Sequence, residues 1–205
     1  MQLSSAQMLA ITCRDLAPRR GGRDVATGIT FASGPGDALV LRGGNGSGKT
    51  SVLRAVAGLC GHRGGVTFAR GGVPVDPGAA RAEDLHLLGA GDGLTGKLSA
   101  AEHVRFWSGL YAARDEAVLT RVGLDGLGHR PANALSTGQR RRLGLARLLM
   151  APRAAWLLDE PLSGLDTAGR TLLLDAVADH RASGGLVLMA THEDGLPDAS
   201  VLRLS

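Results

Sequence analysis

The sequence predicts an α/β domain in which strands and helices alternate and pack in layers. Short apolar runs alternate along the chain with segments whose apolar residues recur at helical spacing. Three of the runs are followed directly by polar residues, and open α/β sheets bind ligands at the carboxyl ends of their strands. A glycine-rich segment also joins the run at residues 38–41 to a helical pattern, as a phosphate-binding loop requires.

The length and composition fit one folded domain. A chain of 205 residues is long enough to bury a sizeable core, and 44% hydrophobic residues exclude a disordered composition. Aromatic residues make up only 3%, so the core is expected to consist mainly of Leu, Val and Ala. We predict a single domain over residues 1–205, with a helical subdomain at roughly 94–150 inserted in its core.

The net charge argues against a nucleic acid partner, and the two cysteines argue against a metal site or a disulfide framework. The net charge of +4 is mild, and no aromatic residues interleave with a basic stripe, so we expect no nucleic acid partner. Cys13 and Cys60 fit neither a metal site nor a disulfide framework, and are expected to be small buried apolar residues.

No segment has the pattern of a membrane insertion signal. The N-terminal residues 1–12 lack a basic stretch followed by an apolar run, which argues against a signal peptide. No apolar stretch approaches the roughly 20 residues that a membrane-spanning helix needs. If the protein works at a membrane, we expect it to do so through a partner.

The elements follow in order from these patterns. The first 30 residues and residues 64–76 are expected to form a small antiparallel β-layer. The run at 38–41 is a buried strand, and the helix after the glycine-rich segment is marked by Val52, Leu53, Val56 and Leu59. Residues 98–150 read as mostly helical, with Ser99 and Glu102 forming a capping box at the start. Further strands are expected at residues 154–158, 186–190 and 201–204, and a helix around Leu172, Leu173, Ala176 and Val177.

An apolar stripe in the helical region has two interpretations. It consists of Phe106, Trp107, Leu110 and Tyr111. The favoured interpretation is helix core, because large aromatic side chains are usually buried. The alternative is a contact surface for another protein.

The glycine-rich segment at residues 43–50 matches G-x-x-x-x-G-K-[ST]. Glycines let successive backbone N–H groups turn inward toward phosphate oxygens, and the following helix adds its N-terminal dipole. Lys49 supplies a charge for the β- and γ-phosphates, and the Thr50 hydroxyl is a ligand for Mg²⁺. The alternative is a glycine-rich turn with a chance Lys-Thr. The predicted nucleotide-binding residues are Gly43, Gly44, Asn45, Gly46, Ser47, Gly48, Lys49, Thr50 and Ser51.

Two carboxylates follow the apolar run at 154–158. Asp159 is placed to hold Mg²⁺ together with Thr50, and Glu160 to orient or deprotonate the water that attacks the γ-phosphate. Taken alone, an acidic pair after an apolar run also fits a surface strand end.

Two further segments carry weaker signals. Ser136 and Gly138 stand at the start of a predicted helix, where a hydroxyl, N–H groups and the helix dipole suit a second phosphate contact. The alternative, which this segment alone favours, is an ordinary capped helix. His192 follows a buried strand and could bond the γ-phosphate, although a capped strand end is the simpler explanation. The other histidines are interpreted as surface or structural: His62, His86, His103, His129 and His180.

Together and in this order, these segments resemble the nucleotide-binding domain of ABC transporters. Residues 43–50 look like the Walker A loop, 157–160 like Walker B with catalytic Glu160, 163–166 like the D-loop with Asp166, and His192 like the switch histidine. The signature resemblance lies at residues 135–139, with Thr137 where a glycine is usual. It comprises Ser136, Thr137, Gly138 and Gln139.

The resemblance implies a P-loop NTPase fold with a RecA-like core, a small antiparallel β-layer and a helical subdomain. It implies an ATPase that uses ATP and Mg²⁺, with Glu160 and His192 as catalytic residues. Two copies would pair head to tail, so that the signature segment of one copy reaches the γ-phosphate held by the other. Closure of this dimer would power a transport complex built on integral membrane permease subunits.

Within the family, the sequence most resembles the ATP-binding subunits of haem exporters of bacterial cytochrome c maturation. The chain is short, the segment at 136–142 resembles the signature of that group, and Arg19 and Arg20 stand where most ABC domains carry an adenine-stacking aromatic. This implies haem export from a peripheral position on the cytoplasmic face of the bacterial inner membrane. Another ABC exporter, a soluble ABC ATPase and a P-loop phosphotransferase are the alternatives.

The sequence departs from the family pattern at the loop that usually carries a Gln contacting Mg²⁺. Residues 89–93 contain no Gln, and Gly91 takes its place, with Asp92 as the nearest substitute. We therefore expect any metal ion to rely on Thr50, Asp159, phosphates and water. The missing aromatic likewise leaves nucleotide affinity to the phosphates.

Overall fold

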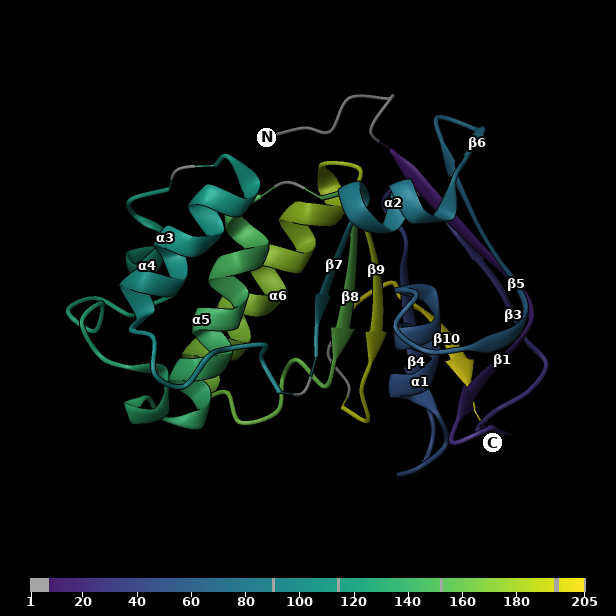
Figure 1. The fold of residues 1–205 in the computed structure, drawn as a ribbon, viewed down its shortest axis with the longest axis horizontal. Helices are drawn as coiled ribbons and strands as arrows, with labels where there is room; N and C mark the ends of the chain where they lie inside the picture. Colours follow the sequence, from purple (N-terminus) through teal and green to yellow (C-terminus); the bar gives the residue numbers. More distant parts are fainter. Residues whose placement is uncertain (1–7, 90, 114, 152, 194–195, 205) are drawn as a thin grey trace.

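The computed structural model describes residues 8–89, 91–113, 115–151, 153–193 and 196–204. A parallel sheet stands in the middle, with an antiparallel sheet on one side and a group of helices on the other (Figure 1). The predicted layered α/β fold, with its small β-layer, is confirmed.

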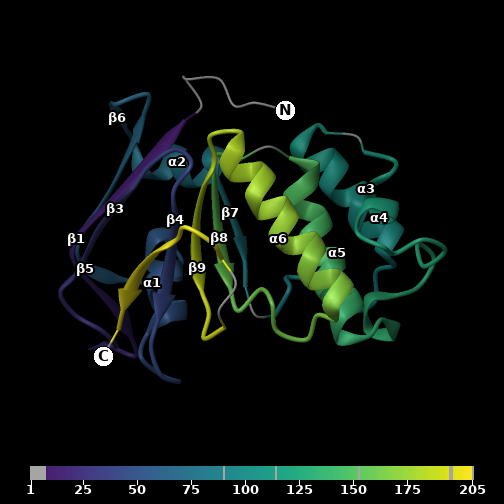
Figure 2. The same cartoon turned by 180° about the vertical axis from the view of Figure 1, so that it is seen from behind.

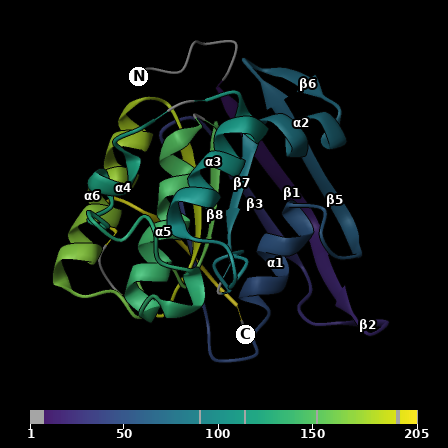
Figure 3. The same ribbon diagram turned by 60° about the vertical axis from the view of Figure 1, so that its left-hand side comes forward.

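The antiparallel sheet forms the outer layer beside the nucleotide motif. It is built from β1 (Leu9–Arg20), β2 (Arg23–Asp24), β3 (Ile29–Ser33), β5 (His62–Arg70) and β6 (Val73–Val75). Its order is β2-β1-β5-β6, and β3 also pairs with β1. Helices α1 (Lys49–Val56) and α2 (Pro77–Asp84) lie between this layer and the parallel sheet (Figure 3).

The parallel sheet has the order β10-β4-β9-β8-β7. Its strands are β4 (Ala38–Arg42), β7 (Leu85–Leu88), β8 (Ala155–Asp159), β9 (Leu186–Ala190) and β10 (Ser200–Arg203). Successive side chains alternate between two buried cores: Leu157 packs with the β-layer and α1, whereas Leu158 packs with the helices opposite. Because both faces are covered, the strands read as continuous apolar runs.

The helices on the other face are α3 (Ala100–Tyr111), α4 (Val118–Arg121), the 3₁₀ turn η2 (Ala132–Ala134), α5 (Thr137–Met150) and α6 (Thr167–Ala182). Helices α5 and α6 lie side by side against the sheet (Figure 2). Ser99 caps α3 in the predicted capping box with Glu102.

Strand β7 and helix α2 were not predicted from the sequence. The β7 run contains His86, which breaks the apolar pattern but is buried, with Nε2 3.1 Å from the Ala151 carbonyl oxygen. Helix α2 starts with Pro-Gly-Ala-Ala and has little apolar periodicity. Its start is fixed by the N-cap Asp76, whose side chain accepts a hydrogen bond from the Ala79 N–H.

The interpretation of the apolar stripe as helix core is wrong for two of its members. Trp107 is buried, but Phe106 and Leu110 are each 61% exposed. The inward face of α3 runs through Ala100, His103 and Trp107, which leaves positions 106 and 110 on the outer face.

Two smaller expectations also need correction. Leu59 is exposed and lies beyond α1, because Gly58 adopts a φ of 73° and helps to end the helix. Cys13 is buried, as expected, and burial raises the pKa of its thiol to about 12, whereas Cys60 is only partly buried. Within the described segments, no helix combines the length and apolarity needed to cross a bilayer.

Two buried histidines predict that acid destabilises the fold. Burial lowers the pKa of His86 to about 3 and that of His180, which stacks on Trp156, to about 4. Because these folded-state pKa values lie below the unfolded value, the unfolded chain binds more protons as the pH falls below about 6.5. We expect each histidine to remove about 2 kcal/mol of unfolding free energy between pH 7 and pH 5. Urea unfolding at the two pH values tests this, and a His180→Phe variant should lose part of the dependence. An unfolding free energy that is equal at both would contradict it.

Candidate functional site

Four chain segments meet at the carboxyl edge of the parallel sheet. They follow β4, β7, β8 and β9, and they contain the phosphate-loop motif, the segment at 89–93, Asp159 with Glu160, and His192. Figure 1 shows this edge at the lower side of the molecule, where α1 and α5 also begin.

The phosphate loop needs glycine at several positions for definite reasons. Gly46 and Gly48 have φ values of 85° and 93°, a region that side chains other than glycine rarely adopt. A Cβ on Gly43 would lie 2.5 Å from Ser47 Oγ and 2.6 Å from the Leu204 carbonyl oxygen. The loop therefore packs closely against Leu204, just after β10, and leads directly into α1.

Lys49 and Ser47 form a polar cradle in this loop. The ammonium group of buried Lys49 donates hydrogen bonds to the carbonyl oxygens of Gly43 (2.8 Å) and Gly44 (3.1 Å). The Ser47 hydroxyl is buried and has no hydrogen-bond partner among the residues that the structure describes. A buried hydroxyl and a buried cation beside a helix N-terminus match the needs of a phosphate group.

Thr50 and Asp159 come together across the sheet. The Thr50 hydroxyl donates a hydrogen bond of 2.9 Å to Asp159 Oδ1, and Asp159 is 4% exposed. In the described part of the chain, no group of three or more His, Cys, Asp or Glu side chains could hold a metal ion. A few oxygen donors fit Mg²⁺, which keeps water ligands and binds through one or two protein groups plus substrate phosphates.

Glu160 has a constrained backbone and a specific partner. Its φ is 47°, a left-handed conformation that costs a residue with a side chain about 1–3 kcal/mol. Its N–H donates to the Ala190 carbonyl oxygen (2.8 Å), and its Oε2 lies 3.1 Å from His192 Nδ1. The structure thus brings the two predicted catalytic residues into contact.

The start of α5 is a capped helix. Ser136 Oγ accepts a hydrogen bond from the Gln139 N–H (3.2 Å), and Gln139 Oε1 accepts one from the Ser136 N–H (2.9 Å). This capping box was missed, although the S-x-x-Q spacing signals it. Within one chain, α1 and α5 lie on opposite faces of the parallel sheet, so the structure does not bring Lys49 and Ser136 into one site (Figure 1).

Asp166 organises the turn before α6. Its Oδ1 accepts a hydrogen bond from the Gly169 N–H (2.9 Å), and its carboxylate pairs with Arg142 of α5. The hydrogen bond from Arg142 has the largest effect on the pKa of Asp166, followed by that from the Gly169 N–H, and both hold this pKa below its ordinary value. The predicted D-loop residue is therefore paired with the helix that begins with the predicted signature segment.

Gly138 packs closely on the same turn, so a larger residue at this position should be destabilising. A Cβ at this position would lie 2.9 Å from the Gly164 carbonyl oxygen. We expect Gly138→Ala to lower the unfolding free energy by about 1–3 kcal/mol through overpacking. Gly109→Ala is a matched control, because Gly109 is also helical and has open space around it. The control should gain about 0.5–1 kcal/mol in urea unfolding, and equal gains in both variants would contradict the prediction.

The segment that lacks the usual Gln differs from the rest of the site. Ala90 lies outside the described residues. Gly91 is exposed, and a Cβ added there would meet no atom of the described residues within 4 Å. Asp92 is not free to replace the Gln, because its Oδ1 lies 2.7 Å from Arg141 Nη1. Burial raises the pKa of Asp92, against the lowering effect of Arg141 and Arg140.

Arg19, which stands where an adenine-stacking aromatic is usual, has partners within the chain. It forms an ion pair with Asp24 and donates a hydrogen bond to the Gly22 carbonyl oxygen.

Comparisons with known proteins agree on one family. The family model described as ABC transporter matches residues 26–163. The cytochrome c biogenesis ATP-binding export protein CcmA of Paramagnetospirillum magneticum is 44% identical over 201 residues, covering 94% of this chain and 93% of its own. The protein of the same name from Bradyrhizobium diazoefficiens is 45% identical over 207 residues, covering 100% and 98%.

A solved structure supports the fold. A putative ABC transporter (ATP-binding protein) from Pyrococcus furiosus superposes with a TM-score of 0.80 over 95% of this chain and 97% of its own. At 21% sequence identity, this likeness bears on the fold alone.

Proposed function

Because the chain belongs to the ABC transporter family, as an ATP-binding subunit that hydrolyses ATP, we propose that it powers a membrane complex of cytochrome c biogenesis. The cargo that we propose is haem, in line with the signature resemblance at residues 136–142. The observation that carries the ATPase role is the assembly of Lys49, Thr50, Asp159, Glu160 and His192 at one sheet edge. The similarity to the cytochrome c biogenesis ATP-binding export proteins supports the proposed complex.

The roles of the nucleotide-binding residues follow from the cradle. Lys49 exchanges its carbonyl partners for the β- and γ-phosphates, and Ser47 with the loop N–H groups surrounds the same phosphates. Thr50 and Asp159 would hold Mg²⁺, which neutralises phosphate charge when bound. The remaining loop residues, from Gly43 through Ser51, shape the cradle.

Glu160 and His192 are proposed to carry the catalytic step. The Glu160 carboxylate orients and deprotonates the attacking water, a role that needs a fixed direction of the side chain. His192 lies against Glu160 with its imidazole 66% exposed, so its ring can also reach a γ-phosphate bound in the cradle. Loss of that phosphate would then remove a hydrogen bond from His192, which follows β9.

The site is proposed to be completed by a second copy of the chain. Ser136, Thr137, Gly138 and Gln139 stand at an exposed or half-exposed helix start on the other side of the sheet from Lys49. A head-to-tail pair would place this helix start of one copy over the phosphates bound by the other. ATP-driven closure of the pair would transmit force to integral permease subunits. We place the subunit at the cytoplasmic face of the bacterial inner membrane, held there by those subunits.

The experiment that tests this function is isolation of the protein from its native membrane, followed by identification of what accompanies it. We expect integral membrane proteins of cytochrome c biogenesis. A permease of another transport system would overturn the cytochrome c assignment, and bound nucleic acid without a membrane protein would overturn the transport role.

A further inference from the structure

Arg141 is a buried arginine whose guanidinium contacts three residues from two segments of the chain, the turn after β7 and the residue after β8. It lies on α5, five positions after the helix cap Ser136, and only 6% of it is exposed. Its Nη1 donates to the Gly89 carbonyl oxygen (3.0 Å) and forms an ion pair with Asp92 Oδ1 at 2.7 Å, in which the atoms are close but not aligned as a hydrogen bond. Its Nη2 donates to the carbonyl oxygen of Glu160 (3.2 Å).

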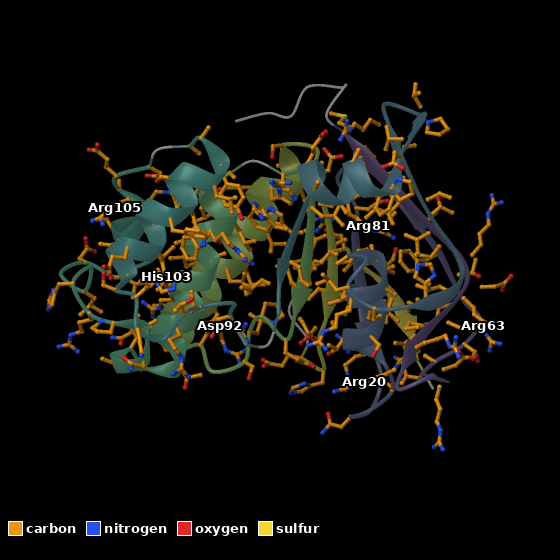
Figure 4. The ribbon with its side chains drawn as sticks, in the orientation of Figure 1. Arg20, Arg63, Arg81, Asp92, His103 and Arg105 are labelled. Atoms are coloured by element: carbon orange, nitrogen blue, oxygen red, sulfur yellow. The ribbon has the colours of Figure 1, made fainter. Side chains whose placement is uncertain are left out.

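Asp92 is built into the fold as the charged partner of Arg141. Its φ of 57° and a hydrogen bond from its N–H to the Gly89 carbonyl oxygen (3.1 Å) form a turn that buries its carboxylate. Figure 4 shows Asp92 between the helices and the carboxyl ends of the strands. Gly144, almost one turn along α5 from Arg141, leaves little room beside this loop, because a Cβ there would lie 2.9 Å from Leu88 Cδ1. The segment after β7 is therefore fastened to α5.

The contact with Glu160 bears on the direction of its side chain. The N–H of Glu160 donates to the Ala190 carbonyl oxygen, and the Glu160 carbonyl oxygen accepts two hydrogen bonds of 3.2 Å, one from Arg141 Nη2 and one from the Ser163 N–H. These bonds lie on either side of the Glu160 Cα, and Arg141 is the donor among them that links the restraint of its left-handed conformation to α5. That conformation sets the Cα–Cβ direction and brings the carboxylate to His192. Asp92, Arg141 and Glu160 also line one cavity of about 530 Å³, together with Thr137 and Arg140.

We propose that Arg141, fixed by Asp92, is a positioning residue that holds Glu160 in its hydrolytic conformation and couples it to the helix that begins at Ser136. A displacement of α5 would move the guanidinium and with it the Glu160 backbone. The Asp92–Arg141 pair thus connects the segment at residues 89–93 to Glu160, although Gly91 in that segment has no side chain to do so. The inference rests on the proposed role of Glu160 in activating water.

The test is a double-mutant cycle between Arg141→Met and Glu160→Gln, with single-turnover hydrolysis of labelled ATP as the readout. Methionine keeps most of the length of the side chain but donates no hydrogen bond. We expect Arg141→Met alone to lower the hydrolysis rate by about 10–100-fold, with KM and the dissociation constant for ATP within about threefold. In the Glu160→Gln background, the same change should have no further effect, because its route through Glu160 is already lost.

A second comparison separates positioning from folding. Asp92→Asn/Arg141→Met removes both buried charges, so it should unfold at a higher urea concentration than Arg141→Met, which leaves Asp92 unpaired. Its hydrolysis rate should stay low, because the Glu160 carbonyl oxygen keeps the Ser163 N–H as a donor but still lacks the hydrogen bond from α5. Arg121→Met is the control, since Arg121 forms an exposed ion pair with Asp115, and it should change neither property.

The outcomes distinguish two failures. If Glu160→Gln by itself leaves hydrolysis intact, the proposed function of Glu160 is overturned. If Glu160→Gln is slow but Arg141→Met slows hydrolysis equally in both backgrounds, this inference alone is overturned. If the Asp92→Asn/Arg141→Met variant recovers both its stability and its hydrolysis rate, the inference is also overturned. The Asp92–Arg141 pair would then have only a structural role.

Discussion

Glu160→Gln is expected to lower the rate of ATP hydrolysis by at least about 100-fold, while the affinity for ATP stays within about threefold of that of the unsubstituted chain. Glutamine keeps the size of the side chain and its contact with His192, but it does not accept a proton from water. Because we propose that the loop at residues 43–50 holds the phosphates, we expect binding not to depend on the lost charge. Steady-state hydrolysis and equilibrium binding of labelled ATP measure the two effects separately.

The control for this variant is Glu83→Gln. Glu83 is an exposed carboxylate on α2 that pairs with Arg70, away from the sheet edge where the nucleotide motifs gather. It should hydrolyse ATP at the unsubstituted rate. A Glu160→Gln chain that keeps more than half of the activity would rule out the assignment of Glu160 as the base.

Lys49→Ala is the second large effect, and it acts on binding. A net loss of one charge-assisted hydrogen bond to the phosphates, about 1.5–3 kcal/mol, should weaken ATP binding by about 10–100-fold. The change also leaves the Gly43 and Gly44 carbonyl oxygens without the ammonium donor that they have in the structure. Equilibrium binding measures the loss, and urea unfolding of the same sample shows that the chain is folded.

The chain's other lysine supplies a matched control. Lys97 is exposed in the segment before α3, so Lys97→Ala removes the same charge without touching the loop. Its affinity for ATP should be unchanged. If the two alanine variants bind ATP equally well, Lys49 is not a phosphate ligand.

The sheet-edge residues could be predicted because they depend on local pattern. Lys49 and Thr50 belong to one continuous motif, and Asp159 and Glu160 directly follow an apolar strand. Although Thr50 and Asp159 are 109 positions apart, the rule that parallel strands present their carboxyl ends at one edge was enough to bring them together.

The remaining features depend on how helices pack, which the sequence pattern does not encode. The pairing of Asp92 with Arg141 requires the register of α5 against the loop after β7, and Arg141 reads from the sequence as one of three consecutive surface arginines. Similarly, the exposure of Phe106 depends on which face of α3 meets α4 and α5. Propensity and periodicity placed this helix correctly but chose the wrong face for two residues.

The central claim is that each ATP site is shared between two copies, and mixed dimers of two inactive variants test it most directly. One variant is Lys49→Ala. The other is Ser136→Asp, which keeps a good N-cap for α5 but adds a negative charge where the partner's γ-phosphate would lie. The two chains, carrying different tags, are produced together and purified with the membrane proteins that accompany them.

Each variant alone is expected to be inactive. In a mixed dimer, one site combines the intact loop of the Ser136→Asp chain with the intact helix start of the Lys49→Ala chain. Random pairing should therefore restore about a quarter of the unsubstituted rate of ATP hydrolysis. If verified mixed dimers show no recovery, the shared site is contradicted. Lys49 and Ser136 would then act on ATP bound within one and the same chain.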